Sequence, residues 1–247
     1  MKQYNYKNLK EDAHVYHLWS PLKFTIKDNY HYIPTSFIFN LISNILYIPI
    51  GLLLFIINYL LYGYKIENKH KILKNTGLVS ISNHLHPMDC TMIGLIYFPR
   101  RVYYPTIQSN FKIPFIRHLI RILYAIPIPT KENQKKSFYK QLNSSLRNKK
   151  IVQMYPEGSL WPYYEEVRNF KYGAFKMAVE ANTPIQPIRF LLVEPTGTHK
   201  LYKRKKSIHA IVLDPIYPND DLEHDARIED LKKRTYEVMK GVNIWKH

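Results

Sequence analysis

The chain is poor in cysteine and in acidic residues. Cys90 is the only cysteine among 247 residues, which excludes an intrachain disulfide and any zinc cluster built on several cysteines. Only 19 Asp and Glu residues stand against 36 Lys and Arg residues, so the formal net charge is +17 at pH 7. Because 46% of the residues are hydrophobic, the chain is not a disordered basic tail. The positive net charge predicts an anionic partner: nucleic acid, an anionic membrane surface, or an acidic ligand or protein.

The positive charge is concentrated before residue 214. Residues 214–247 hold eight of the 19 acidic residues but only six of the 36 basic ones. That end is typical of a solvated helix with mixed charges, which we expect over residues 221–240. The surface that attracts anions therefore lies upstream. The basic run 203–206 is either a solvated loop or hairpin, or a patch that contacts anions.

Charged residues and histidine are absent from residues 33–64. Polar residues precede this stretch and no small-residue cleavage site follows it, so it is not a secretory signal. A single transmembrane helix needs about 20 apolar residues, but Pro49 and Gly51 lie near the middle, and proline kinks or ends a helix. Each half would reach only roughly 21 Å, less than a hydrocarbon core of about 30 Å. We therefore expect a helical hairpin over 33–64 that lies in the interface or dips into one leaflet.

Two alternatives remain for this stretch: one kinked transmembrane helix, or a buried helix pair in a soluble core. Lysines follow directly at positions 65, 69, 71 and 74 and would keep the downstream domain on the cytoplasmic side, facing anionic headgroups. We expect a monotopic or peripheral protein on the cytoplasmic face of the cell membrane. Its expected parts are a polar N-terminal segment (1–32), the hairpin (33–64) and a domain (65–247).

Apolar runs of strand length alternate with helical patterns after residue 64. Strands are expected at 78–82, 102–107, 125–128, 151–155, 185–193 and 208–213, and helices at 87–98, 111–123, 137–147, 170–181 and 221–240. This alternation predicts an α/β sandwich. Functional sites of open α/β sheets are built where strands end.

A histidine and an aspartate occur where the first of these strands leads into a helix. His84 and Asp89 are five positions apart, and across a loop and a first helical turn their side chains can meet. Asp89 would then accept the imidazole N–H, fix the tautomer and favour the imidazolium, as in a catalytic triad. A serine nucleophile is unnecessary if a substrate hydroxyl attacks. The spacing alone is weakly specific, because His209 and Asp214 repeat it within an expected strand, where such residues face opposite sides.

Further sequence blocks follow in a fixed order. They read Tyr-Pro-Glu-Gly-Ser at 155–159, Phe-Lys-Tyr-Gly-Ala-Phe at 170–175 and Pro-Ile-Gln-Pro at 184–187. Together with Asn83, His84 and Asp89 they resemble the 1-acylglycerol-3-phosphate O-acyltransferase (lysophosphatidate acyltransferase) family, whose motifs are Asn-His-x4-Asp, Phe-Pro-Glu-Gly-Thr-Arg, Phe-Lys-x-Gly and Pro-Ile-x-Pro. Residues 111–115 followed by 125–130 look like the second motif of the family. The resemblance covers about residues 75–215.

This resemblance implies an acyltransferase αβ sandwich preceded by the membrane-associated hairpin. The implied reaction moves a fatty acyl group from acyl-CoA or acyl carrier protein to a hydroxyl of a lysophospholipid or related lipid, in phospholipid biosynthesis or remodelling. His84 would be the general base and Asp89 would orient it. The implied substrate-binding residues are Asn83, Thr130, Lys131, Glu157, Gly158, Ser159 and Lys171. Neither a cofactor nor a metal nor a covalent enzyme intermediate is expected, and the partners are the membrane, the acyl donor and the acceptor, not nucleic acid.

Two positions depart from the family pattern. The family usually has an arginine at the end of its second motif and another after Glu-Gly-Thr, both thought to hold the phosphate of the acceptor; here these positions are Thr130 and Leu160. Arginine suits phosphate because it forms bidentate hydrogen bonds. Either Lys131 or Arg168 substitutes, or the acceptor has no phosphate there. We therefore expect a lysolipid acceptor in general rather than lysophosphatidate in particular.

Several residues allow a second interpretation. His86 suits a helix start or a supporting contact, although His84, His86 and Asp89 also resemble part of a metal-hydrolase site. Cys90 suits packing or, alternatively, a nucleophile. Residues 161–164 form a packed surface segment or a wall of the acceptor pocket. The competing function is a basic membrane- or nucleic-acid-binding protein without catalysis, but the chain has no helix-turn-helix or RNA-binding signature.

Overall fold

The computed structural model describes residues 6, 9–10, 13, 15, 19–203 and 205–242. Its strands are β1 (Lys65–Glu67), β2 (Leu78–Ser82), β3 (Val102–Thr106), β4 (Ala125–Pro127), β5 (Ile151–Met154), β6 (Ile185–Val193) and β7 (Ser207–Val212). Its α-helices are α1 (Phe37–Tyr62), α2 (Asp89–Tyr97), α3 (Ile116–Ile122), α4 (Glu132–Arg147), α5 (Gly173–Ala181), α6 (His199–Tyr202) and α7 (His224–Lys240). Short 3₁₀ segments occur at Lys69–Lys71 and Gln108–Lys112.

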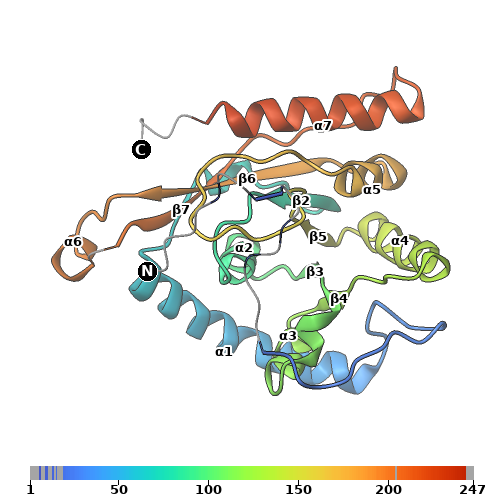
Figure 1. Cartoon of the computed structure of the whole chain (residues 1–247), viewed down its shortest axis with the longest axis horizontal. Helices are drawn as coiled ribbons and strands as arrows, with labels where there is room; N and C mark the ends of the chain where they lie inside the picture. Colours follow the sequence, from blue (N-terminus) through green and yellow to red (C-terminus); the bar gives the residue numbers. More distant parts are fainter. Residues whose placement is uncertain are drawn as a thin grey trace.

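The strands form one mixed sheet in the order β1-β7-β6-β2-β5-β3-β4. All neighbouring strands are parallel except β6 and β7, which are antiparallel. Helices α4, α5 and α7 lie on one side of the sheet, and α1 and α2 lie on the other (Figure 1). The predicted α/β fold is therefore confirmed.

The two helical layers enclose separate apolar cores. Val79 and Ile81 of β2 pack in the same core as Leu142, Phe175 and Leu231 of the covering helices. On the opposite face, Leu78 packs in a core with Met92, Ile93 and Ile96 of α2 and with Phe190 of β6. Because both faces of β2 and β6 are covered, every residue of these strands is buried, as expected for interior strands of an α/β sheet.

The predicted hairpin over residues 33–64 is wrong. α1 is a single helix of 26 residues, and Pro49 and Gly51 lie inside it. Gly51 is a point of close packing, since a Cβ there would lie 2.7 Å from a ring carbon of Phe98. The loss of one helical hydrogen bond at Pro49 does not end the helix, because contacts of Ser43 and Asn58 hold both halves against the domain.

α1 turns its polar side toward the protein and its apolar side outward. Ser43 Oγ donates to the Ile122 carbonyl (2.6 Å), and Asn58 Nδ2 donates to Thr91 Oγ1 (3.0 Å). Only Ser43, Gly51 and Asn58 of this helix are buried, and Ile45 is 64% exposed. The other exposed large apolar residues of α1 include Phe37, Ile38, Leu41, Ile42, Leu46, Ile48, Leu52, Leu53, Phe55, Ile56, Leu60 and Leu61. This distribution excludes the alternative of a buried helix pair, and α1 is long and apolar enough to cross a membrane.

Other predicted elements differ from the structure mainly at their ends. β2 and β6 have the predicted bounds, but β1 and α6 were not predicted. The helix expected over 111–123 is divided into a 3₁₀ segment and α3, because Pro114 and Phe115, which has a φ of +58°, interrupt it. Most of residues 1–18 of the predicted N-terminal segment lies outside the described residues, whereas Ile26 and Tyr32 are buried in the core with α4, α5 and α7.

Candidate active site

Two of the predicted sequence blocks meet at the carboxyl ends of β2 and β5. These strands are parallel neighbours, with Ile81 paired to Met154. The loop after β2 carries His84 and the loop after β5 carries Glu157, so both emerge at one edge of the sheet. The backbone N–H of His84 donates to Glu157 Oε2 at 3.2 Å. Strand pairing therefore brings residues that are far apart in the sequence into direct contact.

His84 and Asp89 are in contact, as their spacing allowed. His84 Nδ1 lies 2.6 Å from Asp89 Oδ2. Asp89 is fully buried and is the first residue of α2, where the partial positive charge of the helix N-terminus favours a carboxylate. The side chain of His84 remains 21% exposed. Since Nδ1 is occupied by Asp89, Nε2 is the ring nitrogen available to a reacting group.

Tyr155 completes a three-residue contact with His84 and Asp89. Its hydroxyl donates to Asp89 Oδ1 at 2.8 Å, and its ring stacks on the His84 imidazole with centroids 4.0 Å apart. Burial, reinforced by the charge of Asp89, raises the pKa of Tyr155 well above its ordinary value, so the hydroxyl stays protonated and remains a donor. Sequence reasoning treated Tyr155 only as the equivalent of a phenylalanine. The added hydroxyl was the signal that could have identified this contact.

Glu157 and Arg168 form a buried ion pair beside the histidine loop. Arg168 Nη2 lies 2.9 Å from Glu157 Oε2, and Arg168 Nη1 donates to Ser159 Oγ at 2.9 Å. The backbone N–H of Arg168 also donates to Glu157 Oε1 at 3.2 Å. The sequence allowed Arg168 as a substitute ligand for the phosphate of the acceptor. The structure instead directs its guanidinium into the protein, toward Glu157 and Ser159.

Asn83 has a structural position. Its side chain donates to the Phe190 carbonyl (3.1 Å) and accepts the Phe190 N–H (2.8 Å), and it is buried. It therefore ties the end of β2 to β6. Of the other residues expected to bind substrate, Glu157 and Ser159 are buried in the network with Arg168.

Gly158 is the exposed residue of the Glu-Gly-Ser block, and the exposed Lys171 lies beside it. Gly158 has a φ of +79°, a conformation that favours glycine, and a Cβ there would lie 2.8 Å from Lys171 Cε. The exposed Lys171 side chain thus covers the glycine at close range. This places a positive charge next to the loop on its solvent side.

Thr130 and Lys131 are exposed and directly precede α4. They follow β4, the edge strand, which β5 and β3 separate from β2. At about 4.8 Å between neighbouring strands, β4 lies roughly 14 Å from β2. These residues therefore share the sheet edge with His84 but lie well to one side of it.

His86 and Cys90 do not have the properties of reactive groups. His86 Nδ1 accepts the Met88 N–H at 3.1 Å, which supports the start of α2, and burial lowers the pKa of His86. Burial and the charge of Asp89 raise the pKa of Cys90 to about 12, so its thiol stays protonated at neutral pH. Within the described parts of the chain, no cluster of three or more His, Cys, Asp or Glu residues is arranged to hold a metal ion. The residues of the second His-x4-Asp pattern have other partners: His209 Nδ1 lies 2.8 Å from Glu67 Oε1, and Lys71 Nζ donates to Asp214 Oδ2 at 2.8 Å.

Residues 161–164 are a packed segment that secures the histidine loop. The backbone N–H of Trp161 donates to the His84 carbonyl (3.2 Å), and the backbone N–H of Tyr163 donates to the Leu85 carbonyl (2.7 Å). The buried Trp161 ring also lies 4.5 Å from the Arg168 guanidinium and stacks on Tyr6. The loop that carries His84 is therefore held from Glu157 on one side and from residues 161–163 on the other.

Comparison with known proteins assigns the family. A family model described as Acyltransferase matches residues 63–191, which is just over half of the chain. The chain belongs to the acyltransferase family. His84, Asp89, Tyr155, Glu157 and Arg168 all lie inside the matched region. The resemblance drawn from the sequence motifs is therefore confirmed at the level of the family, and the family supports acyltransferase activity in lipid biosynthesis.

The acyltransferase fold also has a solved relative. The chain is similar to the crystal structure of PlsC, the 1-acyl-sn-glycerophosphate (LPA) acyltransferase from Thermotoga maritima, with 19% sequence identity and a TM-score of 0.51. The similarity covers 82% of this chain and 80% of that one. The comparison with curated proteins gave no match. At this identity the likeness to PlsC supports the shared fold and leaves the acceptor undetermined.

Replacing Arg168 with Met in this acyltransferase should destabilise the fold. The change leaves the Glu157 carboxylate buried without its countercharge, and breaking such a pair typically costs about 3–5 kcal/mol. Urea denaturation of the purified protein measures the loss. Lys206→Met is the matched control, because its pair with Glu165 is partly exposed and should contribute less than about 1 kcal/mol. An Arg168→Met protein as stable as the parent but with a raised KM for the acceptor would show that Arg168 binds substrate instead.

Proposed function

We propose that the protein is a membrane-associated O-acyltransferase that uses acyl-CoA or acyl carrier protein to acylate a hydroxyl of a lysophospholipid or related lipid. The observation that carries this proposal is the His84–Asp89 contact of 2.6 Å, at a strand end within the region that matches the family. The imidazole is partly open to solvent while the carboxylate is buried. This is the arrangement of a general base with its orienting group.

In the proposed reaction, the hydroxyl oxygen of the acceptor attacks the carbonyl carbon of the donor thioester. His84 Nε2 takes the proton of that hydroxyl at the same time. The tetrahedral intermediate expels the thiolate of the donor, and the imidazolium returns the proton to that sulfur. Asp89 holds the tautomer and stabilises the imidazolium. General-base catalysis typically contributes about 10²–10⁴-fold and positioning of the reactants contributes further. A thioester is already activated, so no nucleophile of the enzyme is required.

Glu157 supports this chemistry by positioning. It accepts the backbone N–H of His84 while the Arg168 guanidinium neutralises its charge. The loop that carries the base therefore cannot shift without losing a hydrogen bond to a member of a buried ion pair. This rigidity suits a step that depends on the alignment of three groups.

The membrane attachment that we propose is monotopic. α1 lies along the domain, bonded to Ile122 through Ser43 near its start and to Thr91 through Asn58 near its end. A span across the bilayer would carry these contacts into the hydrocarbon core. An in-plane helix instead places its apolar side in one leaflet and keeps its polar side on the protein. The excess of Lys and Arg fits the cytoplasmic face, where headgroups are anionic.

Among the residues expected to bind substrate, the positively charged ones are Lys131 and Lys171. Both are exposed, whereas Arg168 is directed toward Glu157. A lysine binds phosphate as a point charge and lacks the bidentate geometry of arginine. We therefore propose an acceptor other than lysophosphatidate. Both donors fit the charge of the chain, because CoA and acyl carrier protein are anionic.

A screen of lysolipid acceptors with both donors tests the proposed function. We expect the purified full chain to acylate at least one lysolipid, with a higher turnover for another lysolipid than for lysophosphatidate, as read by mass spectrometry of the products. A tenfold preference for lysophosphatidate would contradict the proposed acceptor. Acylation of no lysolipid by either donor would contradict the enzymatic function itself.

Tyr155→Phe should change the pH dependence of the reaction. The variant keeps the ring that stacks on His84 but loses the hydrogen bond to Asp89 Oδ1. The Asp89 carboxylate then attracts the imidazolium more strongly, so the acid limb of the kcat/KM profile should move to higher pH, by up to about 1 unit. Tyr164→Phe is the control, because its hydroxyl contacts Glu166 away from the base. An acid limb that does not move in Tyr155→Phe would mean that the hydroxyl does not affect the imidazole and that Tyr155 acts only through the packing of its ring.

A further inference from the structure

The segment between β6 and β7 presents an apolar tip at the C-terminal end of α1. This segment contains α6, in which Leu201 is 86% exposed and Tyr202 is 54% exposed. α6 lies beyond the end of α1, roughly on the line of its axis and away from the centre of the sheet (Figure 1). A single exposed leucine is common on protein surfaces. Leu201, however, adjoins the exposed Tyr202, whose hydroxyl donates to a carbonyl of α1, so the tip lies next to the exposed apolar side of that helix. A contiguous exposed apolar surface marks an interaction site.

α6 is bonded to the last carbonyl groups of α1. His199 Nε2 lies 2.9 Å from the Tyr59 carbonyl, the Tyr202 hydroxyl donates to the Leu60 carbonyl at 3.1 Å, and Lys203 Nζ donates to the Leu61 carbonyl at 3.3 Å. The last carbonyls of a helix lack the regular helical partner, and here the Tyr59 carbonyl also accepts the backbone N–H of Gly63 at 3.0 Å. In water, solvent can satisfy them, whereas at membrane depth the protein must do so. Side chains of the β6–β7 segment therefore contact three successive carbonyls of α1, which suits a helix end that enters the lipid interface.

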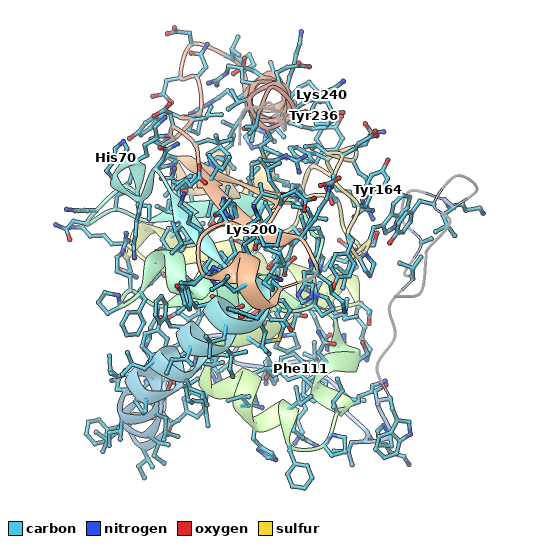
Figure 2. The ribbon with its side chains drawn as sticks, turned by 90° about the vertical axis from the view of Figure 1, so that its left-hand side faces the viewer. His70, Phe111, Tyr164, Lys200, Tyr236 and Lys240 are labelled. Atoms are coloured by element: carbon cyan, nitrogen blue, oxygen red, sulfur yellow. The ribbon has the colours of Figure 1, made fainter. Side chains whose placement is uncertain are left out.

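Basic residues surround the apolar tip. Lys200, Lys205 and Lys206 are exposed next to it. Figure 2 shows Lys200 on α6 beside the ribbon of α1, with Tyr236 and Lys240 of α7 at the far end of the molecule. Apolar side chains flanked by lysines match an anionic bilayer, because the apolar groups enter the acyl boundary while the ammonium groups stay among the headgroups.

We propose that α6 is a second membrane contact, in which Leu201 and Tyr202 insert into an anionic bilayer next to the C-terminal end of α1. The proposal rests on the membrane attachment of the proposed function and extends it beyond α1. A contact beyond the C-terminal end of α1 holds that end at the interface and limits tilting of the helix out of the membrane plane.

Depth-dependent quenching tests this contact in the full-length protein. Tryptophan is introduced as Leu201→Trp or, as the control, Val238→Trp on α7, which is 42% exposed and lies on the other side of the sheet (Figure 1). The vesicles contain phosphatidylglycerol and brominated phosphatidylcholine. We expect at least twofold stronger quenching for Leu201→Trp than for the parent protein, and no added quenching for Val238→Trp.

A charge substitution distinguishes the possible partners. Leu201→Glu should lower vesicle binding in flotation at least threefold at an unchanged melting temperature, and Val238→Glu should not. If the protein floats but Leu201→Trp is quenched no more than the control, α6 is not a membrane contact and attachment by α1 still stands. If Leu201→Glu leaves flotation unchanged but raises the KM for an acyl carrier protein donor, α6 binds that protein and the proposal is wrong. If the parent protein does not float at all, both the inference and the proposed attachment fail.

Discussion

The buried ion pair between Glu157 and Arg168 is the interaction on which the site depends. Glu157 accepts the backbone N–H of His84 and that of Arg168, while Arg168 reaches Ser159 and the face of Trp161. One carboxylate thus joins the loop after β2, the loop after β5 and the segment before α5. Burying two charges is costly unless each is fully paired. Their pairing therefore fixes a single arrangement of these loops.

The helix proposed to lie in the membrane is also joined to the helix that begins at Asp89. Asn58 of α1 bonds to Thr91 of α2, and Gly51 packs closely on Phe98 at the end of α2. At the end of α1, the Tyr62 ring packs edge-on against His86, two residues from the base. The proposed attachment and the proposed chemistry are therefore carried by two helices in direct contact. A lipid acceptor that stays in the leaflet would meet His84 at a height set by α1.

The sequence predicted most where local pattern and burial agree. β2 and β6 have the expected bounds because both their faces are buried, which gives continuous apolar runs. The contact of His84 with Asp89 was also predictable, since it needs only a loop and one helical turn. The hairpin was wrong because Pro49 was weighed as an isolated helix breaker, whereas the contacts of Ser43 and Asn58 decide the path of α1. The Glu157–Arg168 pair lies in irregular structure, where residue spacing has no periodic pattern to indicate a contact. The contact of the Tyr155 hydroxyl with Asp89 could not be predicted from spacing alone, because it depends on the pairing of β2 with β5.

We propose that His84, oriented by Asp89, removes the proton of the acceptor hydroxyl. The most direct test is the rate of acyl transfer by the His84→Ala protein, measured with the donor and lysolipid that the parent uses and with lipid mass spectrometry as the readout. We predict a loss of at least about 10²-fold in kcat, since a general base contributes about 10²–10⁴-fold, with an unchanged melting temperature and unchanged vesicle binding. Acyl transfer at the parental rate by a folded His84→Ala protein would show that His84 is not the general base.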